Sequence, residues 1–595
     1  MTLRTCPFDR SVFCAAALAI ALALGGCAGQ PQKSAAAVDS DDDDDQIAAA
    51  QSPTLRGAPA TAADLPKQEL TGEMVYEFLI AEIAGQRGNV TLSAQAYADL
   101  AKRTRDPRVA ERATEIALHA RNPEAAVEAA KVWADAAPGS TKALGTAASL
   151  LVNTNRVDEA QPYLKRILAA STQNRGDGFM QLNRLLANNP DKGVTLRVVQ
   201  DLAAPYQDLA QARFAIAAAA AGAGQEDLAL KEIREASRLQ PDWELAALFE
   251  AQLLQKQSNT AASQRLAQYL KAYPKSREVR LAYARTLVAD KRYPDARGQF
   301  EQLVKDFPDN TEVVFAVAAL SMQLEDWVSA ERNLKRLLDL NYRDRNQVRF
   351  YLGQVSEEQK RFDEALQWYG EVARGDQFMP AQVRSAQVLL KQGNLDGARR
   401  FLQQVSAQNS DQRVQLILAE AQLLRDAKRE KDAFVVLDDA LAKLPDNPEL
   451  LYDHAMLAEK IERVDVLESS LRKLLKLRPD HAHAYNALGY SLADRNVRLD
   501  EASELIDQAL KLAPEDAFII DSKGWVLFRQ GKPAEALKFL QRAYSSRPDA
   551  EIAAHLGEVL WVLGQRDEAR KVWTDALVKT PDNDVLQKTV QRLSK

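Results

Sequence analysis

Few residues in this sequence have the types and spacing from which catalytic or metal-binding chemistry could be built. His481 and His483 are the one close pair among five histidines, and two imidazoles so near in sequence could share a metal ion. Residues two apart on a helix point to different sides, so we do not expect a shared site. Ser470 and Lys473 match the serine and lysine spacing of penicillin-binding enzymes, but the companion motifs are absent. The sequence also holds no HExxH, Walker or GxSxG motif, and it predicts no catalytic residue, no metal site and no cofactor.

The cysteines are Cys6, Cys14 and Cys27, all within the first 27 residues. The rest of the chain therefore offers no disulfide, no thiolate metal ligand and no cysteine nucleophile. Two arginines precede an apolar run at residues 12–24, which has the charge and length of a secretory signal peptide. We expect residues 1–26 to be removed on export.

The end of the apolar run, Leu24-Gly25-Gly26-Cys27, resembles the bacterial lipobox, in which a small residue precedes an obligatory cysteine. The resemblance implies that Cys27 is lipidated and that cleavage occurs just before it. Several acyl chains anchor a protein stably, whereas one chain gives only marginal membrane binding. In lipoproteins an aspartate after the cysteine favours inner-membrane retention, and Ala28 in its place implies the outer membrane, facing the periplasm. The alternative is an ordinary secretory signal followed by an unrelated cysteine.

Residues 27–70 have the composition of a disordered acidic tether. They are rich in alanine, glutamine, proline, serine and aspartate, and residues 39–45 are aspartates except for Ser40. Such a charge run repels itself and buries no apolar area. About 43 flexible residues would span on the order of 35–40 Å. The aspartates could bind cations, but a solvated spacer is the prediction.

The composition of the remaining chain favours helices. Aromatic residues make up 7%, glycine and proline are sparse, and alanine is abundant, all of which suit helices better than strands. Long alternations of β-branched residues, typical of strands, are absent. The net charge of −6 is spread over both signs without a basic stripe, which argues against nucleic acid as a partner. A length of 595 residues exceeds one ordinary core and indicates several domains or a repeat array.

The clearest pattern in the sequence is a period of 33 to 35 residues. Prolines recur at this spacing, with one gap of 137 residues that is close to four periods. Twelve residues before each proline lies a marker residue, alanine in every case but one, and the markers continue through the gap. The prolines are Pro241, Pro274, Pro308, Pro445, Pro479, Pro514, Pro548 and Pro581, and the markers are Ala229, Ala262, Ala296, Ala330, Ala365, Ala398, Ala433, Leu467, Ala502, Ala536 and Ala569.

This period matches the 34-residue tetratricopeptide repeat, a pair of antiparallel helices, and not the HEAT and armadillo repeats of about 40–47 residues. Small residues at facing positions let two helices approach closely, and proline suits the break between helices. We expect Leu467 to be accommodated by local repacking. The predicted fold is an all-α, right-handed superhelical solenoid of about 13–14 helix pairs.

The regular repeats are predicted over residues 209–581. Divergent helical repeats are predicted over residues 71–208, within which residues 173–208 keep no clear register. Residues 582–595 carry four spaced apolar side chains and indicate a capping helix. Such a cap covers the apolar face that the last repeat would otherwise expose.

The first helices of such repeats are expected to line the inner side of the solenoid, where this repeat family holds peptides or helices. Aromatic side chains there supply large contact area at low entropic cost. The same rings could instead pack between repeats or under the cap, and Trp573 is expected to be a core residue. The predicted protein-binding residues are Asn486, Tyr490, Phe518, Asp521, Trp525, Phe528, Glu558 and Trp561.

Four segments, Ala81–Arg87, Arg105–Arg112, Asn486–Arg495 and Ala554–Trp561, carry a closer resemblance. They are similar to the large tetratricopeptide outer-membrane lipoproteins of pseudomonads and their relatives, a group that includes an adaptor of a periplasmic carboxyl-terminal processing protease. The resemblance implies that the lipoprotein holds a serine protease near the membrane and presents substrates such as cell-wall cross-link hydrolases. Peptidoglycan turnover would then be controlled by regulated proteolysis, and no residue of this chain would perform the cleavage.

Two other functions stay open from the sequence. A scaffold for envelope assembly, such as polysaccharide export or outer-membrane protein insertion, would copurify with a membrane complex and leave proteolysis unchanged. An enzyme would need a polar cluster beside an open pocket, and the sequence shows none.

Overall fold

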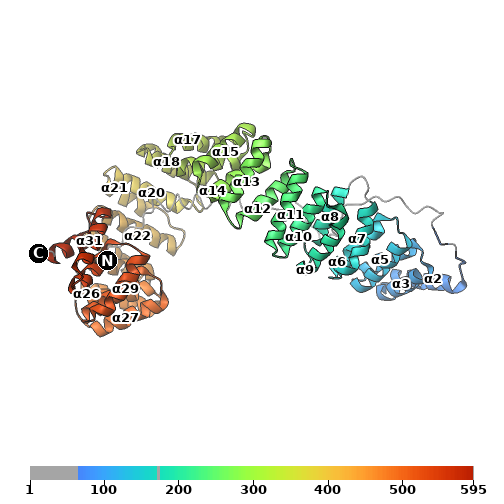
Figure 1. Cartoon of the computed structure of the whole chain (residues 1–595). Coiled ribbons are helices and arrows are strands. Elements are labelled where there is room, and N and C mark those ends of the chain that lie inside the picture. Colours follow the sequence, from blue (N-terminus) through green and yellow to red (C-terminus); the bar gives the residue numbers. More distant parts are fainter. Residues whose placement is uncertain (1–64, 67, 171–174, 594–595) are drawn as a thin grey trace. The chain divides into compact units, whose positions relative to one another are not determined.

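The computed structural model describes residues 65–66, 68–170 and 175–593 (Figure 1). The predicted signal peptide, Cys27 and the predicted tether up to residue 64 lie outside the described residues. Over the described ranges the regular secondary structure consists of 31 α-helices and one short 3-10 helix, without a strand. The prediction of an all-α solenoid is confirmed.

The helices form two compact units, of which the first ends at Leu324 and the second begins at Glu325. We call them the N-terminal unit and the C-terminal unit. The helices of the N-terminal unit are α2 (Gly72–Gln86), α3 (Val90–Thr104), α4 (Pro107–His119), α5 (Pro123–Ala136), α6 (Thr141–Asn153), α7 (Val157–Ala170), α8 (Arg175–Leu186), α9 (Lys192–Ala203), η2 (Ala204–Tyr206), α10 (Ala210–Gly222), α11 (Glu226–Leu239), α12 (Glu244–Gln255), α13 (Asn259–Ala272), α14 (Arg277–Ala289), α15 (Tyr293–Asp306) and α16 (Thr311–Gln323).

The C-terminal unit contains the remaining helices. They are α17 (Trp327–Asp339), α18 (Arg345–Glu358), α19 (Phe362–Gly370), α20 (Phe378–Lys391), α21 (Leu395–Gln404), α22 (Ser410–Asp426), α23 (Glu430–Lys443), α24 (Pro448–Lys460), α25 (Val464–Leu477), α26 (Ala482–Asp494), α27 (Leu499–Leu512), α28 (Ala517–Arg529), α29 (Pro533–Ser546), α30 (Ala550–Val562), α31 (Arg566–Lys579) and α32 (Asp584–Leu593).

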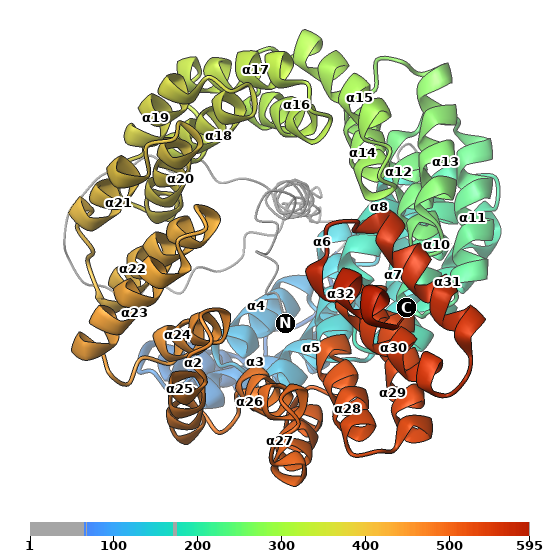
Figure 2. The ribbon, with the colours of Figure 1, turned by 90° about the vertical axis from the view of Figure 1, so that its left-hand side faces the viewer.

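Helices of the C-terminal unit alternate between an inner and an outer row. Figure 2 shows the even-numbered helices from α18 to α30 on the inner side and the odd-numbered helices outside them. Each inner helix packs against the outer helix that follows it, and successive inner helices such as α26 and α28 also pack together. The last helix, α32, packs against α30 and α31 and buries Leu586 there. It covers the end of the array as a cap should.

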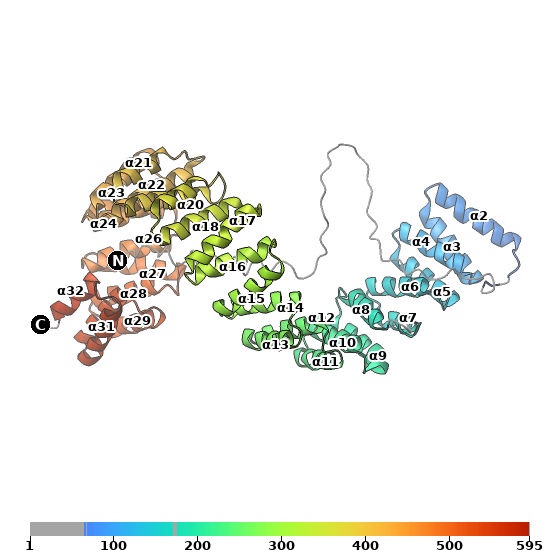
Figure 3. The same cartoon turned by 90° about the horizontal axis from the view of Figure 1, so that it is seen from above.

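The N-terminal unit also stacks consecutive helices side by side, as Figure 3 shows for α2 to α7. Its least regular part is the stretch whose register the sequence leaves open. Residues 171–174 lie outside the described residues, and α8 and α9 follow them. Both helices pack against α10, and α7 packs against both of them. The divergent stretch is therefore helical and continuous with the repeats after it.

The breaks between repeats follow from local chemistry. Asp516 caps α28, because its carboxylate oxygen accepts the backbone N–H groups of Phe518 and Ile519 at 2.9 and 3.1 Å. Those donors have no partner inside the helix, so a polar cap stabilises its start by about 1 kcal/mol. Pro514 stands between the end of α27 and this cap, where it interrupts no helical hydrogen bond.

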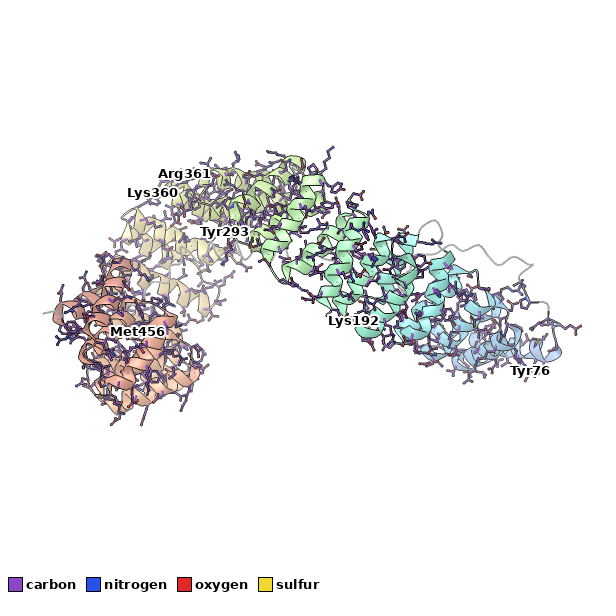
Figure 4. All side chains as sticks on the ribbon, in the orientation of Figure 1. Tyr76, Lys192, Tyr293, Lys360, Arg361 and Met456 are labelled. Carbon is purple, nitrogen blue, oxygen red and sulfur yellow. The ribbon has the colours of Figure 1, made fainter. Side chains whose placement is uncertain are left out.

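Most turns inside the repeats hold a residue in the left-handed backbone conformation, although the turn between α12 and α13 does not. These residues recur at 33 to 35 positions, the same period as the marker alanines, and Figure 4 labels one of them, Lys360, at the turn between α18 and α19. Glycine adopts this conformation without steric cost, whereas other residues do so at some expense. The series is Lys291, Glu325, Lys360, Gly393, Lys428, Glu462, Asn496, Gly531 and Gly564.

All eleven marker residues, from Ala229 to Ala569, are buried, each with 0% of its surface exposed. Leu467 is accommodated as expected, and Ala455 of the preceding helix belongs to the same buried cluster. Close approach is tightest where glycine faces a large side chain. A Cβ on Gly557 would lie 2.0 Å from Trp573, and one on Gly353 would lie 2.4 Å from Tyr369. Trp573 is buried, which confirms the prediction that it is a core residue.

Candidate functional site

Over the part of the chain that the structure describes, no three histidine, cysteine or acidic side chains gather closely enough to hold a metal ion. No described helix is long and apolar enough to cross a membrane. Ion-pair clusters occur in both units, for example around Arg156 in the N-terminal unit, and a buried polar cluster lies on the inner helices of the C-terminal unit.

One such cluster centres on His555 of α30. Its Nδ1 lies 2.9 and 3.1 Å from the two carboxylate oxygens of Asp521 on α28. Its Nε2 lies 3.3 Å from the hydroxyl of Tyr490 on α26. The ring stacks on Trp525 of α28 with centroids 4.2 Å apart. Four side chains from three inner helices are therefore joined around one buried imidazole.

Charge and burial compete at His555. Burial lowers the pKa of the imidazole, but the carboxylate of Asp521, with help from Glu551 and Asp494, raises the pKa above its ordinary value. The protonated ring donates from Nδ1 to Asp521 and from Nε2 to the Tyr490 hydroxyl oxygen. Burial also raises the pKa of Tyr490 well above its usual range, so the phenol stays neutral.

Two further carboxylates lie near this cluster. Glu459 of α24 is partly buried, and burial raises the pKa of its carboxyl. The negative charges of Asp494 and Glu551 raise this pKa further, whereas the positive charge of Lys460 lowers it. Asp494 ends α26 and is exposed. We call Glu459, Tyr490, Asp494, Asp521, Trp525 and His555 the inner patch. Its side chains come from α24, α26, α28 and α30.

Arg529 also lies beside Trp525. Its guanidinium donates to the backbone carbonyls of Ala493 and Asp494 at 3.2 and 3.0 Å and lies 5.7 Å from the Trp525 ring centroid. These bonds hold Arg529 against the end of α26. Its charge is therefore directed at carbonyl oxygens and not at a carboxylate.

The structure brings together three of the residues predicted to bind protein, Tyr490, Asp521 and Trp525. Phe528 is next to them, with its ring centroid 5.3 Å from that of Trp525. Asn486 lies on the same inner helix as Tyr490 and is completely buried. Because its amide has no exposed surface, Asn486 is better placed to pack between repeats than to touch a ligand.

The other three predicted residues have partners within the array. Arg547 lies over the Phe518 ring at 4.9 Å. Glu558 accepts from Arg592 of the cap helix at 2.5 Å. Trp561 lies beside Trp573, with centroids 5.6 Å apart, and its ring carries two arginines of α31. Their roles in binding stay predictions.

His555, Glu459 and Asp494 are not among the residues that the sequence predicts to bind protein. One signal could have revealed the central pair, because Asp521 and His555 are 34 residues apart, one period of the repeat. Residues one period apart lie on neighbouring inner helices at similar heights. The carboxylates gave no such signal, since acidic residues are common on every helix.

A second surface lies on α2, the first described helix. Tyr76, Leu79 and Ile83 are 64, 55 and 45% exposed, and their spacing puts them on one face of the helix. Figure 4 labels Tyr76 on this helix. The opposite face buries Ala81 and Ala84 against the array. Scattered apolar residues are common on surfaces, but an aligned stripe is typical of a face that packs against another polypeptide.

Comparison with known proteins agrees with this architecture. Models of the tetratricopeptide repeat match residues 253–320, 356–421 and 527–593 in one form and 320–380 and 452–517 in another. The TPR repeat-containing protein PA4667 of Pseudomonas aeruginosa is 35% identical over 526 residues, which cover 88% of each chain.

Solved structures show more distant likeness. A chain from the structure of Naa15/Naa10 bound to HypK-THB covers 67% of this chain and 68% of its own length, with a TM-score of 0.39 and 15% identity. A tetratricopeptide repeat protein from Parabacteroides merdae covers 50% of this chain and 99% of its own, with a TM-score of 0.31 and 16% identity.

Proposed function

Because the chain belongs to the tetratricopeptide repeat family, whose members bind other proteins, we propose that it is a non-catalytic adaptor of the outer membrane. It binds a periplasmic carboxyl-terminal processing protease and the substrates of that protease. By holding both, it promotes regulated proteolysis of cell-wall hydrolases. The similarity of its sequence to the adaptor lipoprotein LbcA supports this choice of protease.

One observation carries the adaptor role: the chain has two separate surfaces of different character, one in each unit. The α2 stripe of Tyr76, Leu79 and Ile83 is apolar and exposed. The inner patch combines aromatic rings with carboxylates and a buried imidazole. Two surfaces of different chemistry suit two different proteins, which is what an adaptor must hold.

The membrane anchor is supported by the lipobox alone. Cys27 would carry the acyl chains, and residues 28–70 would set the distance between the bilayer and α2. Fractionation of cells grown with labelled palmitate tests this. The wild-type chain should carry label in the outer-membrane fraction, and the Cys27→Ser variant should carry none. Equal labelling of both would contradict the anchor.

Reconstitution tests the adaptor role itself. The purified chain, the cognate protease and a cell-wall hydrolase are mixed, and the rate of hydrolase cleavage is measured with and without the chain. We expect cleavage to be faster with it. Absence of protease binding, together with unchanged hydrolase levels after gene deletion, would contradict the proposal. Copurification with a membrane assembly complex would then support the envelope-assembly function.

The α2 stripe can be tested in the same assay. A double variant, Tyr76→Asp and Leu79→Asp, places two charges on the exposed face and leaves the buried face intact. We expect it to lose protease binding by at least about tenfold, since charges in an apolar contact are left without partners. Val435→Asp on α23 is a matched control, because Val435 is also exposed and lies outside both surfaces.

A further inference from the structure

The inner patch contains two carboxylates that lack a counterion. Among the described residues, no lysine, arginine or histidine forms an ion pair or hydrogen bond with the carboxylates of Glu459 or Asp494. Glu468, on the outer row, shows the contrast: it pairs with both Arg472 and Arg498. Burial works against the charge of Glu459 and raises its pKa. A cation brought beside it would offset that cost.

The positive charges nearby form no ion pair with these carboxylates; the charge of Lys460, next to Glu459 in sequence, only lowers the pKa of Glu459. His555 is engaged by Asp521 at 2.9 Å and by Tyr490 at 3.3 Å. Arg529 is held by two backbone carbonyls. The uncompensated charge around Glu459 and Asp494 is therefore negative, and it favours a positively charged partner.

Trp525 gives a second and independent indication of a ligand. Its side chain is only 5% exposed, and the Nε1–H group has no acceptor among the described residues. A buried indole N–H almost always finds an acceptor, because leaving it without one costs about 1–3 kcal/mol. The ring lies against His555 and Phe528 on the inner row. A backbone carbonyl of a bound segment would satisfy this donor.

We propose that the inner patch binds a cationic segment of a partner protein, with lysine or arginine side chains at Glu459 and Asp494 and an apolar side chain against the Tyr490 and Trp525 rings. The segment supplies a backbone carbonyl to Trp525 Nε1. This inference deepens the proposed function, on which it rests in one respect: the bound segment would belong to a substrate of the adaptor.

Synthetic peptides test the charge preference directly. Two fluorescein-labelled peptides share the same leucine and tryptophan positions, and one carries lysines where the other carries glutamates. Each is titrated with the purified full chain, and fluorescence anisotropy is measured at low and high salt. We expect the lysine peptide to bind and its affinity to fall with salt, and the glutamate peptide to bind much more weakly. Equal binding of both peptides would overturn the proposal.

Matched variants locate the binding. Glu459→Gln with Asp494→Asn should weaken the lysine peptide by about tenfold, because both attractive charges are lost. Asp439→Asn with Glu504→Gln removes the same charges from the outer helices α23 and α27, and should change affinity less than about twofold. If the two double variants behave alike, the inner patch is not the binding surface.

A third variant tests the tryptophan donor. Trp525→Phe keeps an aromatic ring and removes Nε1–H, so we expect a several-fold loss of affinity with unchanged circular dichroism. Full affinity in this variant would remove Trp525 from the proposal. Saturable binding of Ca²⁺ or Mg²⁺ that displaces the peptide and disappears in Glu459→Gln would mean that the patch is a cation site instead.

The peptide-binding test and the proteolysis test can fail independently of each other. Peptide binding without any effect on proteolysis would leave the cationic preference intact and contradict the protease adaptor. Faster proteolysis without a preference for the lysine peptide would support the protease adaptor and contradict the cationic preference of the inner patch.

Discussion

The two units build the same repeat with different packing. In the C-terminal unit, Gly557 and Gly353 leave room for Trp573 and Tyr369 of the following helix. At the equivalent place in one repeat of the N-terminal unit stands Ala284, which packs in one cluster with Phe300, and alanine also occupies this place in other C-terminal repeats, at Ala386, Ala421 and Ala455. Glycine therefore permits a closer approach and a larger ring. The comparison shows that a fixed period does not fix the depth of contact between helices.

The units also differ in the ionisable groups that they bury. Glu357 of α18 is fully buried and accepts from the Tyr369 hydroxyl at 2.8 Å and from Lys391 at 2.9 Å. His454 and His555 are buried as well. The one histidine of the N-terminal unit, His119, is exposed. The N-terminal unit also buries glutamates, Glu232 and Glu250, so the buried histidines are what should make the stability of the C-terminal unit depend more on pH.

The largest expected effect comes from the buried acid. Glu357→Ala removes the ion-pair partner that Arg384 and Lys391 share and the acceptor of the Tyr369 hydroxyl, and should destabilise α18–α20 by about 3–5 kcal/mol. The surface pair of Asp158 and Arg197 in the N-terminal unit is exposed, and Asp158→Ala should cost at most about 1 kcal/mol. Hydrogen exchange measured by mass spectrometry reports each region separately. Similar losses in both would refute the contrast.

The next effect concerns the glycine contact. Gly557→Ala places a Cβ 2.0 Å from Trp573, and the forced repacking should cost about 1–3 kcal/mol. Ala284→Gly in the N-terminal unit removes a methyl group from a helix and should cost about 0.5–1 kcal/mol. Chemical denaturation with local probes measures both. Trp573→Leu should reduce the cost of Gly557→Ala, because the smaller side chain makes room; independent costs would show that the contact is not the cause.

A third effect is pH dependence confined to the C-terminal unit. Burial lowers the pKa of His555, but Asp521 raises this pKa above the usual value. The stability that the His555–Asp521 pair gives to the fold is therefore complete below the unfolded pKa of about 6.5. It is lost as the pH rises through the pKa of the folded state. Burial lowers the pKa of His454, which stays neutral over this range. We expect amide protection in α28 and α30 to fall as the pH rises above about 6.5 and through the raised pKa of His555.

Asp521→Asn should abolish this fall, and the N-terminal unit should show none. An NMR titration of the His555 ring protons measures the pKa itself. A value below that of an exposed histidine would show that burial outweighs the Asp521 carboxylate.

The smallest effect concerns the left-handed turns, which both units share. Gly531→Ala in the C-terminal unit should destabilise its repeat by about 1 kcal/mol, because a Cβ disfavours this conformation. Lys291→Gly in the N-terminal unit removes that conformational cost, but ordering a glycine costs more backbone entropy on folding. The net effect should stabilise its repeat by a few tenths of a kcal/mol. Thermal unfolding of the two variants should shift in opposite directions. Shifts of one sign would mean that side-chain contacts at these turns dominate.

The sequence was most informative about features that repeat. The spacing of Ala229, Ala262 and the later markers predicted buried helix contacts, and all eleven are buried. The boundary at Leu324 was not predictable, because Ala296 and Ala330 keep the period across it. The inner patch was only partly predicted. Aromatic side chains could be placed by register, but the charge at Glu459 and the partners of His555 depend on which helices lie close in space.

The contact between Tyr490 and His555 has one more consequence. These residues lie on α26 and α30, so the bond passes over the intervening inner helix α28. In an ideal linear array each module is coupled only to its neighbours and the terminal one can fray alone. Here next-nearest coupling ties three modules into one cooperative block, so opening of the last module also removes a hydrogen bond from the third-last. The end of the array should melt in one step of three modules instead of unravelling module by module.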